Sequence, residues 1–274
     1  MTIFEVKNLS FKYDNRYILT NLNFSLNKGE IVGLVGNNGA GKTTLMKVIS
    51  GILPRFEGEI VSKVNKIGVL IEQPSLYPDM TVVSNLRFYC RLYKRNYGII
   101  NQYKKVLNVE DYLNKKVSKL SLGMKQRIGL FVALIASEEF ILLDEPTNGL
   151  DPSGIASLLN LIKKLSQEYG ITFIISSHIL QNLDQICNRN MLLKNHRIVN
   201  LDSTEHLRFR IFSFSISQKE ITDILKENDI KFTTTDRDII VKDYSQVKSL
   251  FEDKKVPIKL EKLGISEVFF DEQI

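Results

Sequence analysis

Short runs of apolar residues recur along the first two-thirds of the chain. The runs at 31–35, 66–72, 140–143 and 171–177 are typical of strands buried on both faces of a parallel sheet. Residues 3–30 instead alternate between apolar and polar positions, which predicts antiparallel strands that form a hairpin. We therefore expect an α/β fold with a mixed, mostly parallel sheet flanked by helices, and an antiparallel β subdomain.

Helical periodicity replaces the strand pattern between residues 81 and 135. Apolar residues recur every three or four positions at 86–93, and a second group at 103–107 suggests another helix. These segments predict a helical subdomain, at about 81–135, inserted into the α/β core.

Ser121 is expected to cap a third, strongly apolar helix. The backbone N–H groups of Gly123 and Met124 would then be free to bind an anion at the start of this helix. Taken locally, the same pattern also fits an ordinary capped helix.

The end of the chain has a different order of elements. We expect strands at 211–216, 231–235, 238–242 and 257–263, with helices at 217–228 and 244–253. The order β-α-β-β-α-β is that of a ferredoxin-like unit. The sequence therefore predicts a large domain over residues 1–205 and a small α+β domain over residues 210–274.

A phosphate-binding loop follows the apolar run at 31–35. Residues 36–43 fit the pattern G-x-x-x-x-G-K-S/T between a predicted strand and a predicted helix, a context that a simple glycine-rich turn would not need. Its glycines are expected to adopt conformations that point backbone N–H groups at phosphate oxygens. Lys42 would reach the β- and γ-phosphates, and the Thr43 hydroxyl would bind Mg²⁺. The predicted nucleotide-binding residues here are Gly36, Asn37, Asn38, Gly39, Ala40, Gly41, Lys42, Thr43 and Thr44.

Charged residues end two of the predicted strands. Ligands bind at the carboxyl ends of parallel strands, so Asp144 and Glu145 are expected in a ligand site rather than as a surface pair. Asp144 is predicted to hold Mg²⁺, directly or through water, and Glu145 to accept a proton from an attacking water. His178 is a candidate γ-phosphate sensor, although a lone histidine is more often structural.

Two further residues are candidates for the same site. Gln73 follows the run at 66–72 and could reach a metal ion and a water molecule, although it could equally be a polar residue that ends a strand. Tyr13 lies at a distance before the phosphate loop that suits stacking on adenine, whereas a lone aromatic residue is more often part of the core.

Composition narrows the class of protein. The chain has 274 residues, 43% hydrophobic and 25% charged, as in globular proteins, and two cysteines without metal-ligand spacing, as in a reduced cytosolic protein. No secretion signal or membrane-spanning run is evident.

The positive charge of the chain is concentrated in one segment. The net charge is +6, but residues 87–127 hold eleven Lys and Arg residues and two acids. Such a patch can attract nucleic acid, anionic lipid or an acidic partner, but more often it is a solvated helix face.

Together, these motifs resemble the ATP-binding subunit of an ABC transporter over about residues 2–205. The matching residues are Tyr13 for the adenine-stacking aromatic, 36–44 for Walker A, Gln73 for the Gln loop, 120–124 for the signature loop, Asp144 and Glu145 for Walker B and its catalytic Glu, 148–151 for the loop that crosses the dimer, and His178 for the switch histidine.

The resemblance implies a P-loop NTPase core and an ATPase that uses ATP and Mg²⁺. It implies catalytic roles for Lys42, Gln73, Glu145 and His178, and metal binding by Thr43, Gln73 and Asp144. Two subunits, expected to be a homodimer, would meet head to tail, with Ser121 and Gly123 of each on the ATP of the other. Separate membrane-spanning permease subunits would hold the protein at the cytoplasmic face of the membrane, and no nucleic-acid partner is expected.

The signature loop departs from the family's usual Leu-Ser-Gly-Gly-Gln. Leu122 and Met124 replace a Gly and the Gln, whereas Ser121 and Gly123 are kept. This form, and the C-terminal extension that ends with the run at 264–270, are similar to bacterial exporters of the bacitracin-resistance and lantibiotic-immunity type. The resemblance therefore implies export of a peptide antibiotic or drug-like compound.

A soluble ATPase of the repair- or translation-associated kind is the alternative. Repair-type relatives carry long coiled coils, but the chain has no sustained heptads. Translation-type relatives carry two nucleotide domains, whereas one phosphate loop is present here. A regulatory subunit without catalytic activity is also disfavoured, because Lys42, Asp144, Glu145 and His178 are all present.

Overall fold

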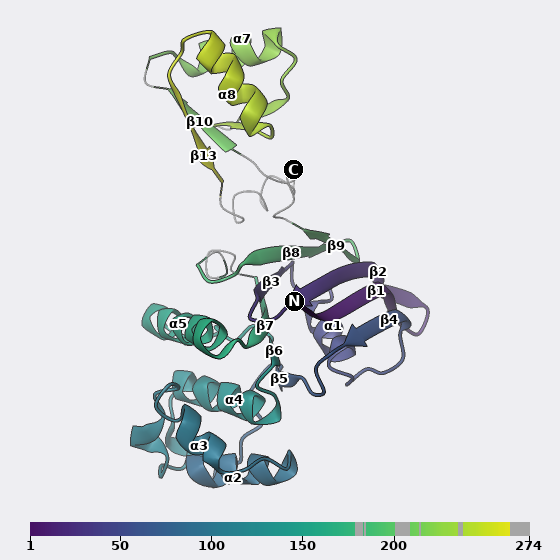
Figure 1. Ribbon diagram of the computed structural model, residues 1–274, viewed down its shortest axis with the longest axis vertical. Coiled ribbons are helices and arrows are strands. Elements are labelled where there is room, and N and C mark those ends of the chain that lie inside the picture. Colours follow the sequence, from purple (N-terminus) through teal and green to yellow (C-terminus); the bar gives the residue numbers. More distant parts are fainter. Residues whose placement is uncertain (179–182, 184, 201–208, 214, 235–237, 264–274) are drawn as a thin grey trace. The chain divides into compact units, whose positions relative to one another are not determined.

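The computed structural model describes residues 1–178, 183, 185–200, 209–213, 215–234 and 238–263. The chain divides into two compact units, residues 1–199 and 200–274. The boundary predicted between residues 205 and 210 falls largely outside the described residues. Each unit is described by itself below (Figure 1).

The antiparallel β subdomain is present at the start of the first unit. It contains β1 (Thr2–Tyr13), β2 (Arg16–Asn27) and β4 (Glu57–Ser62), in the order β2-β1-β4. β1 and β2 form the predicted hairpin. The apolar residues Ile3, Phe4, Val6, Leu9 and Phe11 of β1 are buried. The Phe4 ring packs on Phe140 at 5.2 Å between ring centroids. This contact joins the antiparallel sheet to the parallel one.

The second sheet has six strands in the order β5-β6-β7-β3-β8-β9. They are β3 (Ile31–Val35), β5 (Gly68–Leu70), β6 (Phe140–Leu143), β7 (Thr172–Ser177), β8 (Arg189–Lys194) and β9 (Arg197–Asn200). The pairings from β5 through β8 are all parallel. The mixed sheet and the P-loop NTPase fold class are thus confirmed.

β5 is shorter than the strand expected at 66–72. Glu72 adopts a left-handed conformation, with φ 63°, which turns the chain away from the sheet. At the other end, Gly68 lies against the backbone of Ala133, and a methyl group there would lie 2.3 Å from the carbonyl oxygen. The strand is therefore confined to the three residues that pair with β6.

Three helices pack on the sheet: α1 (Lys42–Ile49), α4 (Leu122–Ala136) and α5 (Pro152–Tyr169). Asp151 caps α5 by accepting from the Gly154 amide, and Gly170 ends it with φ 68°. Hydrogen bonds from the Ser153 hydroxyl and then the Gly154 amide lower the pKa of Asp151, so it stays charged at the helix N-terminus.

The helical insertion contains α2 (Val82–Leu92), α3 (Gly98–Tyr103) and two short 3₁₀ helices, Glu110–Tyr112 and Val117–Lys119. Figure 1 shows α2 and α3 beside α4. The second helix lies earlier than the 103–107 group predicted, because the chain turns after Tyr103 and reverses at Asn108, where φ is 51°. No helix in the described part of the chain is long and apolar enough to cross a membrane.

The second unit has the predicted ferredoxin-like order. Its elements are β10 (Phe209–Ser213), α7 (Gln218–Glu227), β11 (Phe232–Thr234), β12 (Ile239–Val241), α8 (Tyr244–Asp253) and β13 (Ile258–Lys262). The strands form an antiparallel sheet in the order β11-β12-β10-β13. Ser217 and Glu220 form the expected capping box at α7. Buried residues from both helices and the sheet give this unit its own core.

A chain that ends at residue 208 should fold and bind ATP as the full chain does. The second unit has a separate core and contains none of the predicted nucleotide-binding residues. Circular dichroism and calorimetric titration with ATP would measure the two properties. A truncated chain that is folded but binds no nucleotide would contradict this independence.

Candidate functional site

The predicted phosphate loop connects β3 to α1 in the parallel sheet. Gly39 and Gly41 have φ angles of 81° and 106°, which favour glycine, and Gly41 is the N-cap of α1. The loop therefore ends at a helix N-terminus, where backbone N–H groups lack partners within the helix and can bind an anion.

Gly36 has a different reason to be glycine. Its φ angle is not in the left-handed region, so the expectation that all three glycines need a special conformation is wrong for this residue. A methyl group at Gly36 would instead lie 2.7 Å from the carbonyl oxygen of Leu193 in β8. Gly36 thus lets the loop start close to the neighbouring strand.

Lys42 lies in the first turn of α1 and is buried. Its ammonium group donates to the carbonyl oxygens of Gly36 at 2.7 Å and Asn37 at 3.3 Å, and lies 3.4 Å from Oε1 of Glu145. The lysine thus folds back over the loop, with its charge between the loop backbone and a carboxylate from β6.

Asp144 directly follows β6, and its side chain is 3% exposed. The Thr43 hydroxyl donates to Oδ2 at 2.5 Å, and the Ser176 hydroxyl from β7 donates to Oδ1. A buried carboxylate is costly unless it is hydrogen-bonded, and here both oxygens accept a bond. The contact with Thr43 brings the predicted metal-binding pair together.

Glu145 has an unusual backbone conformation, with φ 48°. Its amide donates to the Ser176 hydroxyl oxygen at 2.8 Å. Its Oε2 lies 2.7 Å from Nδ1 of His178, which directly follows β7, while Oε1 faces Lys42. Two nitrogen-bearing side chains thus hold this carboxylate at the edge of the phosphate loop.

A pocket of about 290 Å³ lies between the phosphate loop and Glu145. Its lining consists of Ile18, Asn38, Gly39, Gly41, Lys42, Thr43, Thr44 and Glu145. The sequence pattern missed Ile18, because its place in β2 marks it only as a hairpin residue. The pocket therefore combines a helix N-terminus, one lysine and a carboxylate, which suits a phosphate chain and its hydrolysis.

A family model for ABC transporters matches residues 19–148. The lantibiotic transport ATP-binding protein SrtF of Streptococcus pyogenes is 35% identical over 192 residues, 67% of this chain and 83% of SrtF. The bacitracin transport ATP-binding protein BcrA of Enterococcus faecalis is 32% identical over 265 residues, 89% of this chain and 85% of BcrA. This chain belongs to the ABC transporter family. It is the ATP-binding subunit, which hydrolyses ATP to drive transport, and not a soluble repair- or translation-associated ATPase.

Solved structures agree with this assignment. The dimeric, post-hydrolysis structure of the ATP-binding cassette MJ0796, bound to ADP and Pi, is 26% identical and superposes with a TM-score of 0.61. The match covers 72% of this chain and 96% of MJ0796.

The ABC signature loop lines a different pocket from the phosphate loop. Ser121 caps α4 as predicted and accepts from the Met124 amide at 3.3 Å, so the expectation of a free N–H at Met124 is wrong. Ser121 and Gly123 line a pocket of about 430 Å³ together with residues 149–151. Leu122 faces Gly149, where an added methyl group would lie 3.0 Å from its side chain.

Several predicted ATP-site residues do not line the phosphate-loop pocket. Asp144 and His178 contact Thr43 and Glu145, which do line it, whereas no such contact places Tyr13 or Gln73 there among the described residues. The Tyr13 side chain is 49% exposed and packs edge-on against Phe11. Gln73 is also exposed, on the segment that follows β5. Their assignments to adenine and metal therefore stay predictions.

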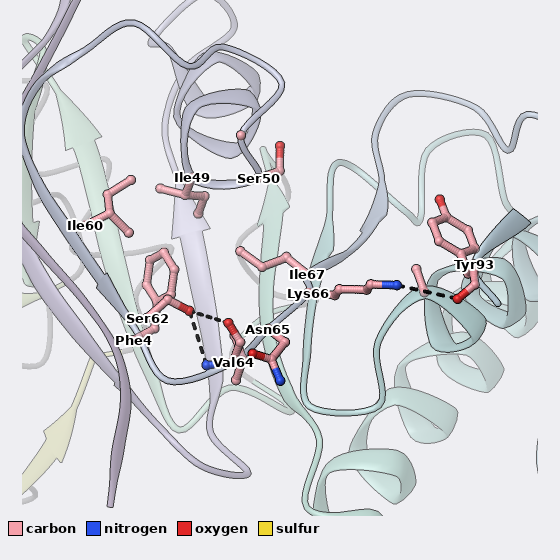
Figure 2. Close-up of a pocket in the computed structure, with 12 residues that line it drawn as sticks. Phe4, Ile49, Ser50, Ile60, Ser62, Val64, Asn65, Lys66, Ile67 and Tyr93 are labelled. Atoms are coloured by element: carbon pink, nitrogen blue, oxygen red, sulfur yellow. Dashed lines mark hydrogen bonds between the residues drawn. The ribbon is translucent and has the colours of Figure 1, made fainter. Parts of the chain in front are cut away.

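A further pocket, of about 460 Å³, lies at the other end of α1 (Figure 2). Its lining is largely apolar and includes Phe4, Ile49 and Ile67. On one side of the pocket, the Lys66 ammonium group donates to the carbonyl oxygen of Tyr93, the C-cap of α2, at 3.5 Å. This hollow contains none of the predicted site residues, so nucleotide binding is assigned to the phosphate-loop pocket.

Replacing Lys42 with alanine should lower the affinity for ATP at least about tenfold, because a hydrogen bond to a charged group contributes about 1.5–3 kcal/mol. Lys47→Ala is the matched control, since Lys47 lies on the same helix and its ion pair within the described residues is with the exposed Glu72. Calorimetric titration with Mg-ATP measures both. Near-normal binding by Lys42→Ala would count against the assigned pocket.

Proposed function

We propose that residues 36–44 hold the phosphates of Mg-ATP and that Glu145 is the general base of hydrolysis. The observation that supports this most strongly is the placement of the Glu145 carboxylate, between Lys42 and His178 and beside the Asp144–Thr43 pair. Backbone N–H groups of the loop and the Lys42 ammonium would bind the phosphates, and Tyr13 would stack on adenine.

The residues present fit a magnesium ion. Thr43 and Asp144 present a hydroxyl and a carboxylate oxygen 2.5 Å apart, and hard oxygen donors are what Mg²⁺ prefers. Mg²⁺ is commonly held by one or two protein groups with phosphate and water oxygens, so a larger protein cluster is not required. When bound, the ion neutralises charge on the β- and γ-phosphates. Gln73 would join this site from the segment after β5.

Three side chains have separate proposed roles in ATP hydrolysis. Glu145 would accept a proton from the attacking water, and a carboxylate in hydrogen-bond reach is the group this step needs. His178 would orient the Glu145 carboxylate and contact the γ-phosphate. Lys42 would stabilise negative charge that develops on the phosphate oxygens.

The second part of the proposal concerns assembly. Ser121 and Gly123 do not line the phosphate-loop pocket of their own chain, so a second copy arranged head to tail would bring them to the γ-phosphate. The dimeric MJ0796 structure supports a dimer of such cassettes. We infer a homodimer at the cytoplasmic face of the membrane, bound to separate permease subunits. The likeness to BcrA and SrtF supports export of a peptide antibiotic or similar compound.

Replacing Glu145 with glutamine should reduce ATP turnover at least about 100-fold, because an amide cannot accept the proton. Bound ATP should then persist and hold two subunits together, so light scattering should show a dimer in Mg-ATP and a monomer in ADP. Glu139→Gln, at an exposed position directly before β6, is the matched control and should turn over normally. A Glu145→Gln variant with wild-type turnover would remove Glu145 from its assigned role.

Adding Ser121→Arg to the Glu145→Gln variant tests whether the ATP-dependent dimer forms through the signature loop. A bulky side chain at the signature loop should block the contact with the second ATP and leave a monomer in Mg-ATP. A dimer that survives Ser121→Arg would contradict the head-to-tail arrangement.

A basic face on α2 is the surface we assign to the membrane partner. Arg87 and Arg91 alternate there with Phe88 and Leu92, which are 37% and 59% exposed, and α2 contains no acidic residue. Lys94 continues this exposed face. Exposed apolar groups among positive charges suit an acidic, amphipathic segment of a protein partner.

Reversing Arg87 and Lys94 to Glu should weaken recovery of the chain with its membrane partner, and more strongly at low salt than at high salt. Basal ATPase activity should be unchanged, because neither residue lines the phosphate-loop pocket. Lys163→Glu with Lys164→Glu, on the exposed face of α5, makes the same charge change elsewhere. If the wild-type chain and both double variants are recovered equally from detergent-solubilised membranes, the α2 charges face solvent and do not bind the membrane partner.

A further inference from the structure

Ser176 is a fully buried polar residue of the parallel sheet. It lies near the carboxyl end of β7, with no exposed surface, directly after three buried apolar residues. The last β6–β7 pair is Leu143 with Ile175, so Ser176 stands beside Asp144, one residue further on. A buried hydroxyl at this point needs partners of its own.

Only one assignment of donor and acceptor satisfies both hydrogen bonds of Ser176. The Glu145 amide can only donate, so the serine oxygen accepts from it at 2.8 Å. The single serine proton then goes to Oδ1 of Asp144, which can accept it as a carboxylate. One hydroxyl therefore joins the side chain of Asp144 to the backbone of Glu145.

We propose that Ser176 is a positioning residue that couples the metal-binding carboxylate to the general base. By occupying Oδ1, it fixes the rotation of the Asp144 carboxylate and turns Oδ2 toward Thr43. By accepting from the Glu145 amide, it supports a backbone conformation, φ 48°, that non-glycine residues seldom adopt. This inference rests on the proposed function of Asp144 and Glu145.

The two bonds predict which step depends on Ser176. Without the hydroxyl, the Asp144 carboxylate could rotate and the Glu145 backbone would lose its hydrogen-bond partner, so metal use and proton transfer should suffer. Nucleotide binding should not, because Lys42 contacts the loop backbone and Glu145 rather than Ser176. The expected effect therefore falls on kcat and on the Mg²⁺ requirement, and not on the affinity for ATP.

A comparison of Ser176→Thr with Ser176→Val isolates the hydroxyl, because the two side chains have nearly the same shape. Thr should keep near-wild-type turnover. Val should lower kcat about 10- to 100-fold, the range expected for loss of a hydrogen bond to a charged group. Val should also need more Mg²⁺ for half-maximal rate, with the Kd for ATP unchanged. Steady-state kinetics, Mg²⁺ titration and calorimetry on the full chain measure these quantities.

Ser166→Ala is the control for a generic loss of a buried hydroxyl. Ser166 is also buried and donates to the Gly29 carbonyl oxygen, and it does not line the phosphate-loop pocket. It should keep the wild-type kcat. Equal kcat for Val and Thr, or an equal fall for Ser166→Ala and Ser176→Val, would overturn the proposal.

Two further results keep the test decisive. If the added methyl group prevents both β-branched variants from folding, Ser176→Ala replaces them, and wild-type kcat and Mg²⁺ dependence in that variant would overturn the proposal. If Glu145→Gln also turns over normally, the proposed function has failed rather than the role of Ser176 alone.

Discussion

Two carboxylates that directly follow a strand buried on both faces set the main constraint on this protein. Charge placed there is costly unless it is compensated, because little water reaches the carboxyl end of β6. Asp144 is compensated by hydroxyl groups from α1 and β7, and Glu145 by Lys42 and His178. The same arrangement collects on one edge of the sheet the side chains to which we assign ATP hydrolysis.

β6 also connects this edge to the helical insertion. Glu138, two residues before the strand, accepts from the Tyr103 hydroxyl at 2.8 Å and pairs with Arg95, which follows α2. At the start of the strand, the Phe140 ring packs against Phe4 of the antiparallel sheet. Four residues of strand thus separate contacts to two subdomains from Asp144 and Glu145. A shift of the helical insertion would reach the site through very little intervening chain.

Local patterns were sufficient to predict the elements and the family. The loop between the strand at 31–35 and the following helix, the apolar strand before Asp144 and the order of the ferredoxin-like unit each follow from local sequence patterns, and the structure contains all three. The predicted strand at 66–72 was too long, because Glu72 turns the chain in a way that apolar periodicity does not reveal. Tyr13 and Gln73 were assigned to the ATP site from their positions in the sequence and from the resemblance, but they do not line the phosphate-loop pocket, and their roles stay predictions.

Contacts between distant segments could not be predicted in the same way. Ser176 looks like an ordinary member of an apolar strand until β7 is paired with β6, which brings it beside Asp144. Gly36 looks like a glycine required for a turn until the Leu193 carbonyl oxygen is found against it. In both cases the reason for the residue lies on a neighbouring strand far along the chain.

The most direct test is a crystal structure of the wild-type chain with Mg²⁺ and an ATP analogue that cannot be hydrolysed. Our account predicts a γ-phosphate between the Lys42 ammonium and the Glu145 carboxylate, and an ion bound by Thr43 on the side of Asp144. A triphosphate bound outside the loop at 36–43, or a Glu145 carboxylate turned away from the γ-phosphate, would contradict it.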